Sequence, residues 1–561
     1  MKSIFRITFS ICIAALLFTS CSKKSREGKM IPKNAMFVAH LDTKSLKEKL
    51  TWDDIKETSW YKKALADTSA KDWMKKLLNN PENSGIDLDG GILFFAVKDA
   101  GPDANIVMEG VIKSQTDFAQ FNKNLDSTSG VRKEGDLNMM TIKGESVVAW
   151  NDKNFTYVIN SGSAKSKFGP MAGDNGQANM APLVDKTNAL SAVCKNLFSL
   201  KPDSSLGSNE KFTDLLAEKG DMHAWINSEE MIKSSPSLGM LGMLKLDVFL
   251  KDNIGTYTVS FEKGKINIKQ KGYAGKEFTD FLKKYSGGGI NTDMVKTIPS
   301  KDVFGVLAMN FKPEGIKELI KLSGMDGFLN MYTGQMGFNL DDFVKANKGD
   351  LALAFTDFKM RNDSNTFPRP DLNILFSVSI GDKPSFQKLI DAGKKMMGQM
   401  RENDTTIAYG QNDKEFVISN HQHFLNDYLA GNSNNKFDFV DKFSGQPINI
   451  YVDIHKILTV LSAEKKGSPD DDTIMSESLK LWSNIYVAAG SMEGDAMTGN
   501  TEINFMDQNT NSLKQLNHYF DEIAKVEMAR SERAKSEMSP DSLSAPPPPV
   551  DIPAPSDSAS H

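Results

Sequence analysis

The chain has 561 residues, of which 40% are hydrophobic and 25% are charged, a composition typical of a globular protein with more than one hydrophobic core. Its 67 Lys and Arg residues are interleaved with 72 Asp and Glu residues, which gives a net charge of -5. Because the two signs of charge are interleaved along the body of the chain, the sequence indicates no basic face that would bind phosphate backbones. We therefore expect no nucleic-acid partner.

Residues 1–20 have the pattern of a signal peptide. Lys2 and Arg6 precede an apolar run, residues 7–18, that is shorter than the roughly 20 residues a membrane span requires. The run leads into the letters LFTSC, which end at Cys21 and resemble the lipobox of bacterial lipoproteins. The resemblance implies cleavage before Cys21 and attachment of lipid, such as palmitate, to its sulfur, which would anchor the chain to a membrane. The alternative is an ordinary secretory signal peptide that is cleaved elsewhere.

Residues 21–30 form a polar, basic segment, which predicts a flexible tether between the lipid and the body of the protein. Surface-exported lipoproteins of the Bacteroidetes resemble one another in the acidic residues that follow the cysteine, and this chain has Lys23 and Lys24 there. The difference favours a cell-envelope protein anchored on the periplasmic face of the outer membrane.

The body of the chain contains two similar series of segments, which predict a tandem duplication. In the first series, Ile31-Pro32 leads to an apolar strand that ends at Asp42. In the second series, Ile298-Pro299 leads to an apolar strand that ends at Asn310. A helix is expected after each strand, and Asp42 and Asn310 stand where a side-chain oxygen can cap it.

Further matches follow in the same order. They pair residues 85–89 with 337–341, residues 105–107 with 373–375, the expected hairpin turns 151–155 with 412–416 and, more weakly, residues 224–227 with 450–453. We assign the first repeat to residues 31–285 and the second repeat to residues 290–507. The glycine-rich segment 286–289 is expected to join them flexibly.

Within each repeat, short strands separated by hairpin turns alternate with single helices. This pattern predicts an α+β fold of mainly antiparallel sheet covered by helices. Apolar residues at helical spacing predict a C-terminal helix over residues 508–535. The tail, residues 536–561, is rich in proline and serine and is expected to be disordered.

The lipid signal, the Ile31-Pro32 opening and its recurrence at Ile298-Pro299 resemble the Bacteroidetes lipoproteins that share domain of unknown function 4836. The resemblance covers nearly the whole chain. It implies the envelope location and the architecture described above, and it supplies no catalytic residue and no cofactor.

Three groups of side chains are candidates for metal binding, and we favour another role for each. His421 and His423 are close in sequence, but a helix start there would direct their rings about 200° apart. Asp87 and Asp89 resemble part of a calcium loop, yet they fit a turn before a strand. The three aspartates at 470–472 are expected in a solvated loop. We therefore predict no metal site and no cofactor.

The sequence contains no phosphate-binding loop, nucleophile elbow, zinc-protease motif or paired-cysteine motif. Cys194 is the one cysteine left after the signal peptide and Cys21, and we expect it to pack in the core rather than to act as a nucleophile. We therefore favour a protein without catalytic activity.

Three functions stay open. The favoured one is a lipid-anchored, non-catalytic envelope protein that binds or scaffolds another envelope component, either a protein or a lipid. The second is a carrier of lipid or another apolar ligand, which the 28 Met and 33 Phe residues suggest, with Met240 and Met243 in a candidate flap over a pocket. The third is an envelope hydrolase whose two carboxylates come together only in the fold.

Overall fold

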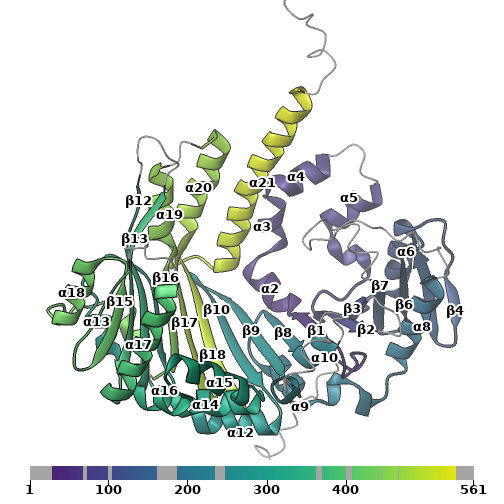
Figure 1. The fold of residues 1–561 in the computed structure, drawn as a ribbon. Helices are drawn as coiled ribbons and strands as arrows, with labels where there is room; N and C mark the ends of the chain where they lie inside the picture. Colours follow the sequence, from purple (N-terminus) through teal and green to yellow (C-terminus); the bar gives the residue numbers. More distant parts are fainter. Residues whose placement is uncertain are drawn as a thin grey trace, which may run out of the picture.

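The computed structural model describes residues 28–66, 72–98, 104–160, 186–233, 247–361, 369–399, 407–443, 445–464 and 467–537. These residues form one 18-stranded antiparallel sheet with helices on both faces (Figure 1). The predicted class, helices packed on mainly antiparallel sheet, is confirmed. Among the described residues, no helix combines the length and the hydropathy that crossing a bilayer requires. The expected signal peptide, Cys21 and the tail beyond residue 537 lie outside the described residues.

The described residues contain the 18 strands of this sheet. In chain order they are β1 (Phe37–Leu41), β2 (Ile92–Lys98), β3 (Ala104–Val111), β4 (Arg132–Glu134), β5 (Leu137–Ile142), β6 (Ser146–Trp150), β7 (Asn154–Asn160), β8 (Met222–Asn227), β9 (Ile254–Glu262), β10 (Lys265–Tyr273), β11 (Val303–Asn310), β12 (Asn347–Arg361), β13 (Arg369–Ile380), β14 (Ala408–Gln411), β15 (Glu415–Ser419), β16 (Ile448–Asp453), β17 (Trp482–Glu493) and β18 (Ala496–Phe505).

The sheet is centred on the pairing of β10 with β18, where Lys265 lies opposite Asn504 and Gly272 opposite Met497. Outward from this pair, one side runs β9, β8, β1, β2, β3, β7 and β6. The other side runs β17, β16, β11, β12, β13, β15 and β14. When the strands are counted along each half of the chain, both halves therefore have the same spatial order. The first half continues with β5 and β4.

The hairpin turns expected at 151–155 and 412–416 are present and have the same hydrogen bonds. Asn151 Oδ1 accepts bonds from the backbone N–H groups two and three residues later, both at 2.9 Å. Asn412 Oδ1 accepts the equivalent two bonds, also at 2.9 Å. A side-chain oxygen that satisfies its own turn in this way explains why asparagine opens both hairpins.

The two caps expected after the opening strands differ. Asp42 Oδ1 accepts a hydrogen bond from the Ser45 N–H at 2.9 Å and caps the first helix, as predicted. Asn310 caps no helix, because the next helix begins at Pro313 with Lys312 at its N-cap position. The Oδ1 of Asn310 instead accepts a hydrogen bond from the Gly288 N–H at 2.7 Å. Gly287 approaches the Asn310 carbonyl so closely that a Cβ there would collide with it. The glycine segment is therefore packed against β11, which corrects the expectation of a flexible joint.

Hydrophobic cores lie on both faces of the sheet. We call the face that carries the side chains of Val38 and Leu375 the first face. Its cores are covered by α8 (Lys186–Phe198), α9 (Glu210–Ala217), α13 (Thr292–Lys296) and α18 (Gln422–Ala430). Those on the opposite face are covered by α2 (Thr43–Lys49), α6 (Gln115–Leu125), α16 (Leu340–Ala346), α17 (Lys383–Gln399), α20 (Pro469–Leu481) and α21 (Ser512–Glu537).

The other α-helices of the described residues are α3 (Trp52–Lys56), α4 (Ser59–Ala66), α5 (Asp72–Asn79), α10 (Ser228–Lys233), α11 (Asp247–Leu250), α12 (Lys276–Tyr285), α14 (Pro313–Leu322), α15 (Asp326–Met336) and α19 (Ile454–Glu464). Short 3-10 helices lie at η1 (Pro81–Ser84), η2 (Pro202–Ser204), η3 (Leu206–Ser208) and η5 (Val440–Phe443).

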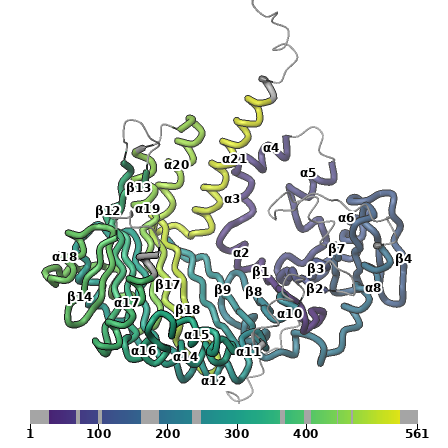
Figure 2. The backbone as a smooth tube through the Cα atoms, in the orientation of Figure 1, coloured from purple at the N-terminus to yellow at the C-terminus, as the bar shows by residue number. Residues whose placement is uncertain are grey.

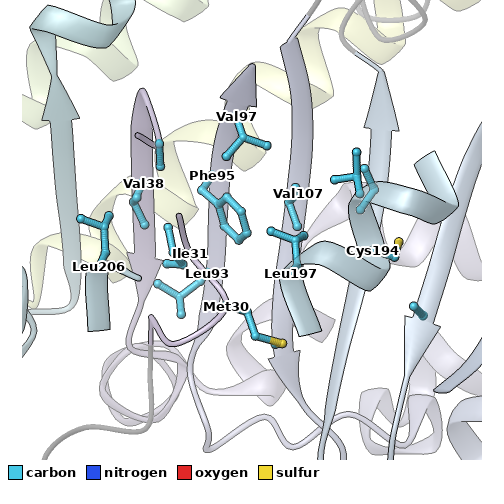
Figure 3. Close-up of a cluster of buried hydrophobic side chains, with 14 of the residues drawn as sticks. Met30, Ile31, Val38, Leu93, Phe95, Val97, Val107, Cys194, Leu197 and Leu206 are labelled. Carbon is cyan, nitrogen blue, oxygen red and sulfur yellow. The ribbon is translucent and has the colours of Figure 1, made fainter. Parts of the chain in front are cut away.

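The folded body already includes Gly28, which lies within the segment 21–30 that the sequence predicts to be a flexible tether. Met30 and Ile31 are part of the first-face core, where they pack with Val38, Phe95 and Leu206 (Figure 3). The carbonyl of Gly28 accepts a hydrogen bond from Ser205 Oγ at 2.7 Å. A buried methionine and a bonded backbone fix this segment, so the last residues of the expected tether belong to the body.

Helix α21 coincides with the predicted C-terminal helix and contacts both halves of the chain (Figures 1 and 2). Leu513 packs in a cluster that includes Leu46 of α2 and Trp482 of β17. Asp521 Oδ1 accepts a hydrogen bond from the Ser59 N–H, at the start of α4, at 2.6 Å. The C-terminal helix therefore packs against α2 and α4 of the N-terminal half and against β17 of the C-terminal half.

Candidate functional site: an apolar cavity beside helix α17

The second half of the chain contains an apolar cavity of about 600 Å³ between the sheet and α17. Its volume lies within the range of small-molecule sites in proteins. Apolar and aromatic residues form most of its wall, together with one glycine, one asparagine and one lysine: Phe311, Phe343, Asn347, Leu351, Phe376, Val378, Phe386, Leu389, Ile390, Gly393, Lys394, Ile407, Tyr409, Phe416 and Ile418.

Strand alternation makes the sheet side of the cavity apolar. On β13, Leu375 belongs to the core of the first face, so its neighbour Phe376 points to the opposite face and lines the cavity. Phe376 lies opposite Ile418 of β15, and Val378 lies opposite Phe416. These cross-strand pairs of apolar side chains form a continuous wall.

Helix α17 forms the facing wall. Phe386, Leu389 and Gly393 are spaced by three and four residues, so they share the side of the helix that faces the sheet. Phe386 is 5% exposed, and its ring centroid lies 5.4 Å from that of Phe416 on the facing sheet. No atom lies within 4 Å of the place that a Cβ on Gly393 would take, so this residue leaves room along the helix.

Part of the cavity wall is open to solvent. Ile407 is 57% exposed and Tyr409 is 43% exposed. Lys394 reaches across this opening from α17, and its Nζ lies 5.9 Å from the centre of the Tyr409 ring. Lys394 is the one charged side chain among the described residues that line the cavity. The site therefore has an apolar interior and a cationic rim.

The corresponding place in the first half is filled. In the β6–β7 hairpin, Trp150 lies opposite Phe155, whereas in the β14–β15 hairpin Gln411 lies opposite Phe416. Strand β5 adds Met140, which packs with Trp150 in the same cluster. Both side chains are almost fully buried. The second half has Gln411 in place of this tryptophan and no described strand in place of β5, and the cavity lies there.

A pair of histidines that sequence reasoning missed is buried in the first half. His40 of β1 lies opposite His223 of β8, with their Nδ1 atoms 3.1 Å apart and their rings stacked at 5.3 Å. Burial, and then the neighbouring His223, lower the pKa of His40 to about 4. Burial also lowers the pKa of His223, whose Nε2 lies 2.9 Å from the Glu218 carbonyl oxygen. Two neutral imidazoles therefore share one hydrogen bond.

The histidine pair has no counterpart in the second half. The residues that face each other at the equivalent point of the β11–β16 pairing are Ala308 and Asn449. His40 and His223 are 183 positions apart in the sequence, and each stands alone in an apolar strand. No spacing rule links them, so only the fold shows that they are neighbours.

The histidines proposed from the sequence are at the start of α18, as expected, but their rings are not splayed apart. His421 precedes the helix in extended conformation, and its ring centroid lies 5.7 Å from that of His423. Because the first residue is not helical, the 200° separation of a regular helix does not apply. Within the described residues, no group of three or more His, Cys, Asp or Glu side chains is arranged to hold a metal ion.

The aspartate candidates also take structural roles. Asp87 Oδ1 accepts a hydrogen bond from the Asp89 N–H at 3.0 Å, in the turn before β2 that the sequence predicts. The three aspartates at 470–472 begin helix α20 rather than lie in a loop. Asp470 and Asp471 bind Arg530 of α21 at 3.0 and 2.7 Å. Carboxylates in the first turn favour a helix, which explains this difference from the expectation.

Cys194 packs in the core on the first face (Figure 3). Its Sγ lies 4.0 Å from the Val147 carbonyl oxygen, and burial raises the pKa of the thiol to about 12. A protonated, buried thiol is a poor nucleophile, which agrees with the packing role predicted for it. The candidate flap with Met240 and Met243 lies outside the described residues.

Comparisons with known proteins identify one region of the chain. Residues 28–168 match the family model of a domain of unknown function, DUF4836. No curated protein matches the chain. A solved structure, "Structure of crystal form III of TP0453", aligns over 47% of this chain and 87% of its own at 8% identity, with a TM-score of 0.23, which does not support a shared fold. Residues 28–168 therefore carry a domain of unknown function, and the cavity lies beyond them.

Proposed function

We propose that the protein is a non-catalytic binding protein of the cell envelope that holds an apolar ligand in the cavity beside α17. The apolar lining of that cavity is the observation that carries the proposal. Water molecules form few hydrogen bonds with an apolar wall. An apolar ligand that displaces this water removes hydrophobic surface of both the ligand and the cavity from solvent. Of the three functions open from the sequence, this geometry favours the carrier.

We also infer that the two halves are copies of one module. The equal strand order on either side of β10 and β18 supports this inference, and so do the matching Asx turns at Asn151 and Asn412. In such a duplication, the side chains of Trp150 and Met140 fill the space in the first copy that corresponds to the cavity of the second copy. The ligand is accordingly assigned to the second copy.

The anchor completes the proposal. The signal-peptide pattern and the LFTSC letters that end at Cys21 support a lipid-modified N-terminus on the periplasmic face of the outer membrane. We expect the change Cys21→Ser to abolish incorporation of radiolabelled fatty acid into the protein in growing cells. A labelled Cys21→Ser protein would contradict the anchor, while leaving the cavity proposal in place.

The binding proposal is tested by mass spectrometry of the lipids and other apolar molecules that co-purify with the protein. We expect the wild-type chain to carry an apolar molecule at close to one per protein. The variant Gly393→Leu should lose most of it, because the new side chain extends from α17 into the cavity. Its helix should be more stable, since glycine costs about 1 kcal/mol in a helix interior, so loss of ligand would not reflect unfolding.

The matched control is Gly334→Leu on α15. This helical glycine also has no atom within 4 Å of the place that a Cβ would take, and it lies outside the cavity. The control variant should retain the ligand at the wild-type level. Equal ligand content in the wild type and in Gly393→Leu, or a wild-type protein that carries no apolar molecule, would refute the proposed function.

A further inference from the structure

The polar groups at the cavity opening indicate which end of a ligand they would meet. Lys394 and Tyr409 are the polar side chains at the exposed end, and an ammonium group and a phenol both donate hydrogen bonds. Asn347, the remaining polar residue of the wall, uses its amide nitrogen to bond the Phe343 carbonyl at 2.7 Å. The opening therefore offers donors to a ligand and places a positive charge beside them.

Lys394 is available for such a ligand. Within the described part of the chain its ammonium group makes no ion pair. Asp391, a carboxylate one helical turn earlier, accepts a hydrogen bond from Gln387 at 2.9 Å. The alkyl stem of Lys394 lines the apolar wall, and its charged end lies over the Tyr409 ring at the opening. This arrangement lets a lysine bury its stem while the ammonium group stays in solvent.

We propose that the ligand is a single-chain amphiphile with an anionic head group, whose alkyl chain fills the cavity and whose head binds Lys394. The proposal rests on the proposed function and adds the class of the ligand. A long-chain carboxylate and an alkyl phosphate share this chemistry. An anion beside an ammonium group forms a charge-assisted hydrogen bond, which is shorter and stronger than a neutral one. An uncharged or cationic head would lose that bond.

The test compares amphiphiles that differ only in the head group. Dodecanoate, dodecan-1-ol and dodecyltrimethylammonium are titrated into the purified protein by calorimetry at about pH 8, where the dodecanoate carboxyl group is ionised. We expect dodecanoate to bind about tenfold more tightly than the alcohol, as one charge-assisted hydrogen bond at an exposed site implies. The cation should bind more weakly than the alcohol. Added salt should weaken the binding of dodecanoate and leave that of the alcohol unchanged.

The variant Lys394→Met removes the charge and keeps an apolar stem. It should lower the affinity for dodecanoate about tenfold and leave the affinity for dodecan-1-ol within twofold of the wild type. The matched control, Lys395→Met, alters the neighbouring lysine, which does not line the cavity. It should leave both affinities unchanged.

The outcomes separate the two proposals. If dodecanoate and the alcohol bind the wild type equally, or if Lys394→Met weakens both to the same extent, the cavity binds apolar chains and the anionic preference is wrong. If no amphiphile binds the wild-type protein, the proposed function fails and the preference fails with it. A dodecanoate affinity that falls equally in Lys395→Met would show a general surface effect and would also overturn the role of Lys394.

Discussion

At the scale of single residues, the buried histidine pair makes the stability of the first half depend on pH. The pKa of His40 is lowered from 6.5 to about 4, first by burial and then by His223, while Asp42 opposes the shift. In the unfolded chain His40 therefore binds a proton near pH 6.5, whereas in the folded chain it binds one only near pH 4. Stability is full above pH 6.5 and falls as the pH drops toward 4, by about 3 kcal/mol for His40 alone.

We expect urea unfolding of the wild type to show this loss between about pH 6.5 and 4. The double variant His40→Ala/His223→Asn copies the residues Ala308 and Asn449 of the second half, and its stability should change less over the same range. The comparison uses the slope with pH, so a constant loss from repacking does not affect it. His423→Ala, which removes an exposed histidine, serves as the control. A double variant with the wild-type slope would show that other groups cause the pH dependence.

At the scale of elements, α21 supplies a cap to a helix far from it in sequence. Asp521 is 7% exposed, and its two carboxylate oxygens accept hydrogen bonds from the backbone N–H and the hydroxyl of Ser59, at 2.6 and 3.3 Å. The first N–H groups of a helix have no partner within it, and the helix dipole favours a negative charge there. α4 therefore depends on α21 for the start of its first turn.

We predict that Asp521→Ala lowers the free energy of unfolding by about 1–2 kcal/mol, the usual cost of losing a helix cap. Hydrogen exchange of the α4 amides should become faster than that of the sheet. The control Glu522→Ala removes the next carboxylate, which pairs with Lys525 at the surface, and should cost less than about 1 kcal/mol. Unchanged exchange in α4 would mean that its packing, and not this cap, holds the helix.

Sequence patterns were most informative about elements whose determinants are local. The Asx turns at Asn151 and Asn412, the Asp42 cap and the amphipathic α21 each depend on residues within a few positions of one another. The cap predicted from Asn310 is absent because α14 begins at Pro313, with Lys312 at its N-cap position. Proline is favoured at the first position of a helix, and here it sets the start of α14 beyond the reach of Asn310.

The candidate site could not be predicted in the same way. The cavity exists where Trp150 and Met140 of the other half have no equivalent, and a missing side chain leaves no motif. The high content of methionine and phenylalanine did suggest an apolar ligand, but it placed the pocket near Met240. Most residues that line the cavity come from β12 to β15, α16 and α17, and in the sequence their apolar side chains look like ordinary core positions.

At the scale of the whole molecule, one sheet runs through both halves, although the sequence suggested two separate repeats. β10 and β18 lie far apart in the sequence, so no local pattern indicates that they pair. The outer edges are short, three residues in β4 and four in β14. Short edges limit pairing with other molecules.

The central pairing has a consequence for synthesis. β10 ends at Tyr273, whereas its partner β18 ends at Phe505, so the ribosome makes the first half long before that partner exists. During this interval β10 is an open edge, the kind of surface on which nascent chains associate wrongly. Lys265, Lys269 and Lys271 lie along it. Because lysines on an open edge oppose pairing with other strands, we expect these residues to limit wrong association of the growing chain until β18 is made.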